Sequence, residues 1–174
     1  MITPEADAWR LLQGLCAPGE SPWILAGGTP APRRKEKLDA QKVVGLVGVA
    51  ALAVAAAALP VDELPSFEAG RERILCLTSH RLLVVHVRAS PRLLARPDVH
   101  VEACGAWLPT EVPRLLEAVG EERVLFVDTV VFTMREPGAG ERVVCTMSEG
   151  WRDNLAAARA LAARLRALVE PPTG

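Results

Sequence analysis

The chain has 174 residues, of which 50% are hydrophobic and 24% are charged. This composition excludes a disordered chain, and a chain of this length buries a core without disulfides or bound metal. The formal net charge is −1, which argues against a dedicated nucleic-acid binder, because affinity for phosphates needs a surplus of basic residues.

Four cysteines, Cys16, Cys76, Cys104 and Cys145, are scattered along the chain without a CxxC pair. Zinc sites favour closely spaced ligands, so this spacing argues against a structural metal site. The first residues, MITPEADAW, have neither a basic region nor an early apolar core and do not resemble a signal peptide. We therefore expect reduced cysteines, a bacterial type of cytoplasmic protein and no cofactor.

Residues 1–17 predict a helix. Thr3, Pro4 and Glu5 suit the start of a helix. An apolar stripe at helical spacing follows at Ala8, Leu11, Leu12 and Leu15. The sequence Ala17-Pro18-Gly19 ends this helix, and Trp23–Ala26 predicts a short strand that stops at Gly27-Gly28.

A basic, proline-interrupted stretch follows at residues 29–42, with five basic and two acidic residues. Such a run is usually a solvated surface. The alternative is contact with an anionic membrane surface through the cluster Arg33, Arg34, Lys35 and Lys37.

The run Val43–Leu59 contains 17 uncharged residues and predicts an Ala/Gly-rich apolar helix. One interpretation is a helix buried within the protein or packed in an oligomer, where Gly45 and Gly48 allow close contact. The alternative is a single membrane span or re-entrant segment, although a span usually needs about 20 apolar residues. Basic residues precede the run, which would place the N-terminus in the cytoplasm.

A β-hairpin is predicted at the centre of the chain. Two apolar runs, Ile74–Leu77 and Leu82–Val87, flank the four turn-like residues Thr78-Ser79-His80-Arg81. Residues 90–97 contain two prolines and predict a loop, and the alternation in Val99–Cys104 predicts a weak strand.

The C-terminal part predicts a second hairpin and a helix. Val124–Met134 and Val143–Met147 are the expected strands, whereas Leu115–Val119 is ambiguous and Gly120-Glu121-Glu122 is expected to be a turn. Ser148 is a plausible N-cap for the final helix. One face of that helix is apolar, with Trp151, Leu155, Ala158, Ala162, Leu165 and Val169. Its flank carries Arg152, Arg159 and Arg166, which we interpret as a solvated surface or a partner-binding face.

The segment Glu72–Val85, ERILCLTSHRLLVV, is similar to the "LTxxRL" hairpin of bacterial pleckstrin-homology-like domains. Residues 18–26, PGESPWILA, resemble the first strand of that family, in which a Gly/Ala-rich apolar segment often lies between the two pieces. The resemblance spans roughly residues 18–169. It implies an α+β fold: a partly open antiparallel β-barrel or two-sheet sandwich with a C-terminal amphipathic capping helix. It also implies a binding or assembly module and no enzyme.

Eukaryotic relatives of this family often bind phosphoinositides through basic residues after the first strand, and Arg33, Arg34, Lys35 and Lys37 occupy a comparable position. The apolar run at 43–59 departs from the simple first hairpin of the family, so no ligand contact is transferred. We expect one domain, with an N-terminal helix at 1–17, an inserted apolar helix at 43–59, and a β-body with its capping helix at 18–28 and 72–169.

Candidate catalytic groups are few. Cys76 and His80 flank a turn without a third partner, and His86 is expected on the polar face of its strand. Alternation places His100, Glu102 and Cys104 on one strand face, where a metal site is conceivable but unusual. Asp128 lies inside an apolar strand and is expected to be exposed or paired, at a bulge or an edge.

Nucleotide-binding and hydrolase motifs are absent from the sequence. We therefore expect a non-enzymatic scaffold that binds a protein partner or itself, in the cytoplasm and with a possible membrane contact. No nucleic-acid or small-molecule ligand is indicated. Two alternatives remain: a protein anchored in the membrane through 43–59, and a small enzyme with an unrecognised site.

Overall fold

The structure is a computed structural model. It describes residues 3–32, 71–90, 96–124, 127–135, 141–147 and 151–169. The predicted apolar helix at 43–59, the basic residues Arg33, Arg34, Lys35 and Lys37, and the predicted N-cap Ser148 lie outside the described residues.

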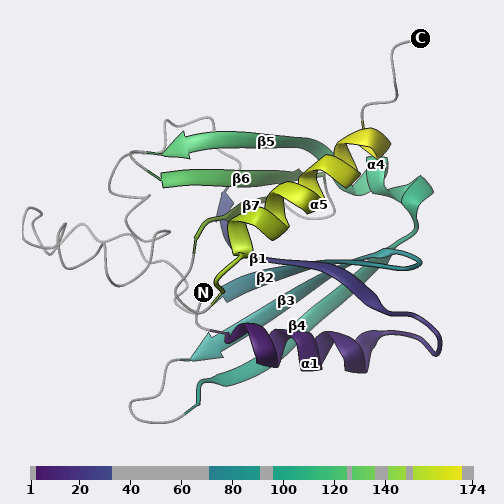
Figure 1. Cartoon of the computed structure of the whole chain (residues 1–174), viewed down its shortest axis with the longest axis vertical. Helices are drawn as coiled ribbons and strands as arrows, with labels where there is room; N and C mark the ends of the chain where they lie inside the picture. The colour runs from purple at the N-terminus through teal and green to yellow at the C-terminus, as the bar shows by residue number, and fades with distance from the viewer. Residues whose placement is uncertain are drawn as a thin grey trace, which may run out of the picture.

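The described residues form an antiparallel sheet and several helices (Figure 1). In chain order the elements are α1 (Glu5–Leu15), β1 (Pro22–Pro32), β2 (Arg71–Thr78), β3 (Leu82–Ser90), β4 (Asp98–Trp107), the 3-10 helix η2 (Pro109–Glu111), α4 (Val112–Leu115), β5 (Leu116–Val124), β6 (Val127–Met134), β7 (Glu141–Cys145) and α5 (Asn154–Val169). The strand order is β4-β3-β2-β1-β7-β6-β5. Within the described ranges the sheet is not closed, and β4 and β5 form its edges.

Strand β1 joins the two halves of the sheet, β1–β4 and β5–β7. Its residues up to Gly28 pair with β2, and those from Thr29 pair with β7. A side chain at Gly28 would place its Cβ 2.6 Å from Val143 Cγ1 and 2.9 Å from Cys145 Sγ. Only glycine therefore allows the strand to pass this close to β7.

The larger hydrophobic core lies between the two halves of the sheet and α5. It is built by buried residues from β1–β3, β5–β7, α4 and α5, with Phe132, Leu116, Leu161 and Leu165 among the largest. We call the face of β1–β4 that points toward this core the inner face. Leu75 and Val84 lie on it.

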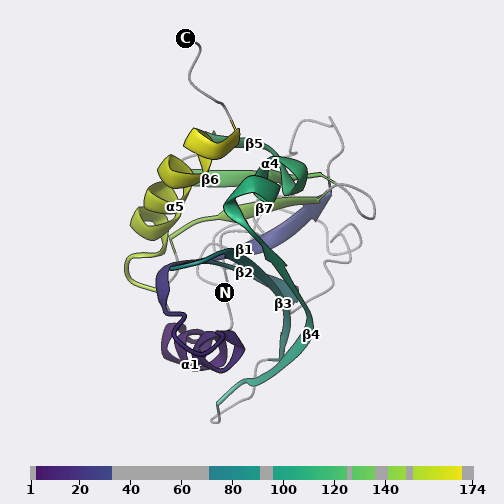
Figure 2. The same cartoon turned by 90° about the vertical axis from the view of Figure 1, so that its right-hand side faces the viewer.

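Helix α1 covers the opposite, outer face of β1–β3 (Figure 1). In this second core, which we call the α1 core, Ala8 and Leu12 of α1 pack with Ile74, Cys76 and Val85. Figure 2 shows β3 and β4 curving around the side of this helix. The central parts of β2 and β3 are therefore buried on both faces, which explains why Leu82–Val87 is a nearly continuous apolar run.

Two buried polar side chains tie the start of α5 to the rest of the molecule. The Asn154 amide accepts a hydrogen bond from Gly27 N (2.7 Å) and donates to the carbonyls of Gly27 (2.8 Å) and Thr146 (2.7 Å). The Trp151 indole packs in the α1 core and donates to the Thr3 carbonyl (2.8 Å). Because buried polar groups need partners, these bonds fix where α5 begins.

The structure confirms the predicted N-terminal helix, the central hairpin, the strand within β4, the C-terminal helix and the α+β antiparallel class. Trp151 is 1% exposed, as predicted from its apolar pattern, but it precedes the helix, because α5 begins only at Asn154. None of the helices in the described part of the chain is long and apolar enough to cross a membrane.

Three predictions need correction. The first strand does not stop at Gly27-Gly28 but continues to Pro32, because β7 replaces β2 as its partner. Gly120-Glu121-Glu122 is not a turn, since these residues lie inside β5 and pair with β6. Val124 is the last residue of β5, and β6 begins at Val127.

Candidate binding surfaces

The turn between β2 and β3 is organised by Thr78. Its hydroxyl accepts hydrogen bonds from the amides of His80 (3.2 Å) and Arg81 (3.0 Å) and donates to Glu20 Oε1 (2.5 Å). Short side chains of this kind stabilise turns by bonding to nearby backbone. The threonine of the "LTxxRL" pattern therefore shapes the turn and also binds the loop after α1.

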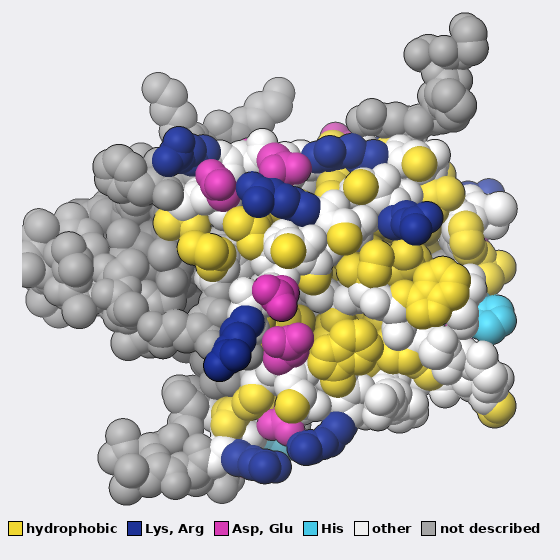
Figure 3. All heavy atoms as spheres, in the orientation of Figure 1, with side chains coloured by type: hydrophobic (Ala, Val, Ile, Leu, Met, Phe, Trp, Pro, Cys, Tyr) yellow, Lys and Arg dark blue, Asp and Glu magenta, His cyan; other side chains and the backbone are white. Residues whose placement is uncertain are grey.

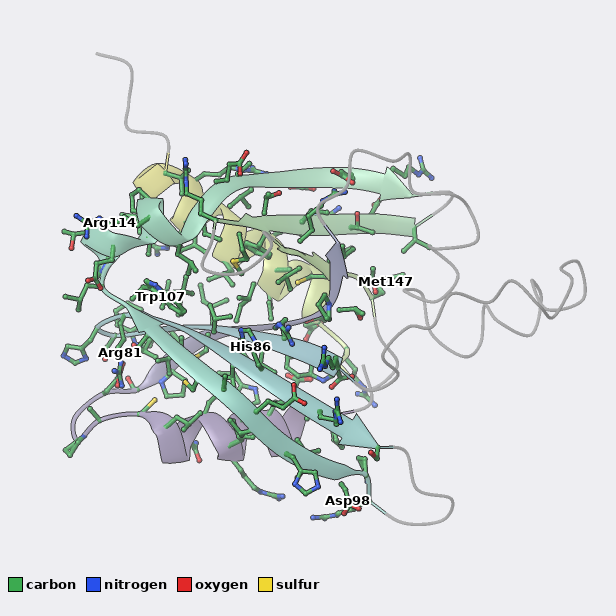
Figure 4. The ribbon with its side chains drawn as sticks, turned by 180° about the vertical axis from the view of Figure 1, so that it is seen from behind. Arg81, His86, Asp98, Trp107, Arg114 and Met147 are labelled. Atoms are coloured by element: carbon green, nitrogen blue, oxygen red, sulfur yellow. The ribbon has the colours of Figure 1, made fainter. Side chains whose placement is uncertain are left out.

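Arg81 and Glu20 form a bidentate ion pair next to this turn. Arg81 Nε donates to Glu20 Oε1 and a terminal guanidinium nitrogen donates to Oε2, both at 2.9 Å. The Ala17 amide also donates to Oε2 (2.8 Å). Arg81 reaches the Leu15 carbonyl at the end of α1 (3.4 Å), and Figure 4 shows it beside the loop that follows this helix.

This ion pair changes the titration of both groups. The hydrogen bonds from Arg81 lower the pKa of Glu20 from 4.5 to about 2, against the opposing effect of burial. The same pairing raises the pKa of Arg81. The Glu20 side chain is 2% exposed, so water screens the pair weakly. The pair therefore fastens α1 to the hairpin and is not free to bind a ligand.

The cysteine and histidine candidates do not form a nucleophilic site. Burial raises the pKa of Cys76 to about 12, so its thiol stays protonated at neutral pH. His80 Nδ1 instead lies 2.7 Å from the hydroxyl of Ser79. His86 lies on β3 between Val85 and Val87, which face α1, so it occupies the inner face (Figure 4); that face points toward the larger core and is not the polar face that was predicted.

The metal hypothesis for β4 is not supported by its geometry. The register of β3 and β4 shifts between His86 and Val87, so Glu102 is an extra, bulged residue and the alternation from His100 to Cys104 is interrupted. Glu102 lies 3.1 Å from Arg88, at ion-pair distance. In the described ranges, no group of three His, Cys, Asp or Glu residues is placed to hold a metal ion.

The three arginines predicted on the last helix differ in their surroundings. Arg159 contacts Glu121 (3.1 Å) and Asp128 (3.4 Å), and Arg166 donates to the Val119 carbonyl (3.2 Å). Arg159 therefore connects α5 to β5 and β6, and Arg166 connects it to β5. Arg152 is exposed but does not lie on the helix, because α5 begins only at Asn154. Asp128 is exposed and paired, as predicted, although β6 is an internal strand and not an edge.

A groove of about 340 Å³ lies where α1, β1 and α5 meet, and we call it the Trp groove. Its lining consists of Glu5, Trp9, Trp23, Ile24, Leu25, Trp151, Asp153, Asn154, Ala156, Ala157 and Ala160. The small alanines of α5 leave space beside the helix, and the tryptophans supply the walls. Figure 3 shows the resulting hydrophobic patch between the two helices.

The tryptophans that line the groove differ in how much of each side chain is exposed. Trp23 is 62% exposed at the start of β1, whereas Trp151 is 1% exposed and lies beneath the groove. Trp9 is partly buried and packs against the α1 core. Exposed apolar surface around a concavity is typical of a binding site, because its burial by a partner is favourable.

The only charged residues that line the Trp groove are acidic. Glu5 is the first residue of α1 and Asp153 immediately precedes α5. Figure 3 shows acidic side chains beside the hydrophobic patch. The Asn154 amide is already used by Gly27 and Thr146, so it fixes the backbone and does not face a ligand as an unpaired group.

Sequence reasoning did not find this groove. Trp9, Trp23 and Ala156 are far apart in the chain, and the fold brings them together. No local signal marked Trp23 as exposed, because it belongs to the apolar run Trp23–Ala26; in the structure it lies at a register shift between Pro22 and Ile24. Comparisons with protein-family models, curated proteins and solved structures give no match for this chain.

Proposed function

We propose that this protein is a non-enzymatic, pleckstrin-homology-like binding module that mediates protein assembly. The observation that carries the proposal is the Trp groove, in which Trp23 is 62% exposed beside the alanine face of α5. Grooves of this kind accept apolar side chains of a partner, since aromatic walls offer a large contact area at low entropic cost.

The strand order supports the family part of the proposal. Four consecutive strands, β1–β4, form one half of the sheet, and β5–β7 form the other. The two halves meet where β1 pairs with β7. The amphipathic helix α5 follows the last strand and packs on the shared core. This arrangement agrees with the barrel or sandwich and capping helix that the "LTxxRL" resemblance implies.

The lining of the Trp groove favours binding over catalysis. It contains no Ser, Cys, His or Lys, so a nucleophile with an adjacent base is not available there. The two carboxylates are set among indole and methyl groups, and no other titratable side chain lines the groove. Such a lining binds and orients a partner but lacks the converging polar groups of an active site.

The test is affinity capture from a lysate of the organism that encodes the chain, with wild-type, Trp23→Ala and Met147→Ala proteins in parallel. Met147 is the matched control, since it is 68% exposed and does not line the groove. We expect a protein that is retained by the wild type and by Met147→Ala but lost with Trp23→Ala. A partner set that is identical for all three baits would contradict the proposal.

A membrane anchor is a second candidate, favoured by the uncharged run Val43–Leu59 and the basic residues before it. Washing membranes with carbonate distinguishes the two cases, because a spanning protein stays in the membrane fraction. Release into the supernatant removes this candidate.

A further inference from the structure

We infer that the Trp groove recognises a short protein segment in which a bulky apolar residue lies beside a lysine or arginine. This inference rests on the proposed function and adds the chemistry of the partner. It follows from two properties of the lining: its indole and methyl surface and its single sign of charge.

The apolar half of the recognition follows from shape. Ala156, Ala157 and Ala160 present only methyl groups, so α5 offers a shallow floor next to Trp23 and Trp9. Ligand pockets usually have volumes of roughly 300–1,000 Å³, and this groove is at the lower end of that range. It therefore suits one or two side chains of a segment and not a large cofactor.

The basic half follows from charge. The chain as a whole is nearly balanced, with 20 basic and 21 acidic residues, yet both charged residues in the lining are acidic. A carboxylate near the start of a helix is also favourable on its own, through the helix dipole. That effect explains why Glu5 opens α1 and Asp153 immediately precedes α5, but it does not require both to line one aromatic groove.

The tryptophans reinforce this preference. The face of an indole ring carries negative potential, and a lysine or arginine side chain over it gains a cation–π interaction. A cation in this groove is therefore attracted by the indoles and by the carboxylates. An acidic segment or an anionic membrane surface is repelled by Glu5 and Asp153, so neither is the expected occupant.

The experiment is selection of a displayed library of random 12-residue peptides on the immobilised full-length protein. We expect the enriched peptides to combine a bulky apolar residue with a lysine or arginine within a few positions. Synthetic copies then serve as probes, with binding followed by tryptophan fluorescence. Enriched peptides that lack basic residues, or no enrichment above the Trp23→Ala background, would overturn the inference.

Three variants test the two halves separately. Trp23→Ala should abolish binding of the selected peptides, and Met147→Ala should leave it unchanged. The double variant Glu5→Gln, Asp153→Asn keeps the shape and removes the charge, so binding should weaken by about threefold per carboxylate and become insensitive to salt. Equal affinity of the double variant and the wild type would refute the inferred preference for a lysine or arginine in the bound segment.

Two outcomes separate this inference from the proposed function. If a captured partner depends on Trp23 but not on Glu5 and Asp153, the inference fails while the binding module stands. If light scattering shows a wild-type dimer that Trp23→Ala converts to a monomer, the occupant is a second copy of the chain, and the basic-segment inference is wrong. If no partner depends on Trp23, both fail.

Discussion

The two long helices are fastened to the sheet by the same kind of ion pair in different surroundings. At the end of α1, the Glu20 side chain that binds Arg81 is 2% exposed. On α5, Arg159 binds Glu121, whose side chain is 46% exposed. Because water and salt screen exposed charges, burial and hydrogen bonding decide how much each pair contributes, and the number of pairs does not.

The largest effect is expected where the two helices meet, at Trp151. It is 1% exposed, packs in the α1 core and donates to the Thr3 carbonyl. Trp151→Ala should lower the free energy of unfolding by about 4 kcal/mol, because it leaves a cavity between the helices. Trp151→Phe keeps most of the packing and should cost less; denaturant unfolding of both variants measures the difference. Equal losses would show that the hydrogen bond, and not the cavity, dominates.

The next effect tests how α5 begins. Asn154→Ala removes three hydrogen bonds to Gly27 and Thr146 and leaves buried backbone groups without these partners. We expect a loss of about 3 kcal/mol in the free energy of unfolding. The exposed neighbour Arg152 is the control, and Arg152→Ala should change stability by less than about 0.5 kcal/mol. Similar values for the two variants would contradict the anchoring described for Asn154.

The α1 ion pair should have a distinct dependence on pH. Glu20→Gln should destabilise the protein by about 2 kcal/mol at pH 7, since it removes charged hydrogen bonds to a nearly buried side chain. The folded-state pKa of Glu20 is lowered from 4.5 to about 2, so its contribution is complete above about pH 4.5 and is lost as the pH falls toward 2. Stability curves of the wild type and Glu20→Gln should therefore converge in acid. A constant difference between pH 6 and pH 2.5 would refute this assignment.

The smallest effect is expected on the exposed side of the comparison. Arg159→Ala removes contacts with Glu121 and Asp128, both well exposed, and should cost about 0.5 kcal/mol. High salt should reduce even this difference, whereas it should leave most of the Glu20 effect in place. Thermal unfolding at low and high ionic strength measures both. If Arg159→Ala lowers the free energy of unfolding more than Glu20→Gln does, burial does not decide which ion pair contributes more.

Local patterns in the sequence were sufficient to predict much of the fold. The hairpin at Ile74–Val87 and the helix after Trp151 have strong periodic patterns, and both are present. The strand β5 was missed at Gly120-Glu121-Glu122, because an edge strand carries polar residues that resemble a turn. The end of β1 was misplaced because a sequence does not show that a strand changes partner at Gly28.

The candidate site was beyond local patterns. Trp23 and Ala157 become neighbours only after α5 packs across the start of β1, which is a long-range consequence of the fold. The Glu20–Arg81 pair was equally hidden, although both residues lie in the segments that carry the family resemblance. In this chain the residues of the pattern stabilise the fold, which is why the motif alone did not locate the Trp groove.

The dual pairing of β1 has a consequence for how the molecule unfolds. This strand bonds to β2 with one part of its length and to β7 with the other, so opening it breaks both halves of the sheet at once. Its amide protons should therefore be among the last to exchange with deuterium. A fragment that ends between β4 and β5 keeps β1 but loses β7, so residues 29–32 of β1 lose their pairing partner. We therefore expect neither half of the sheet to fold by itself.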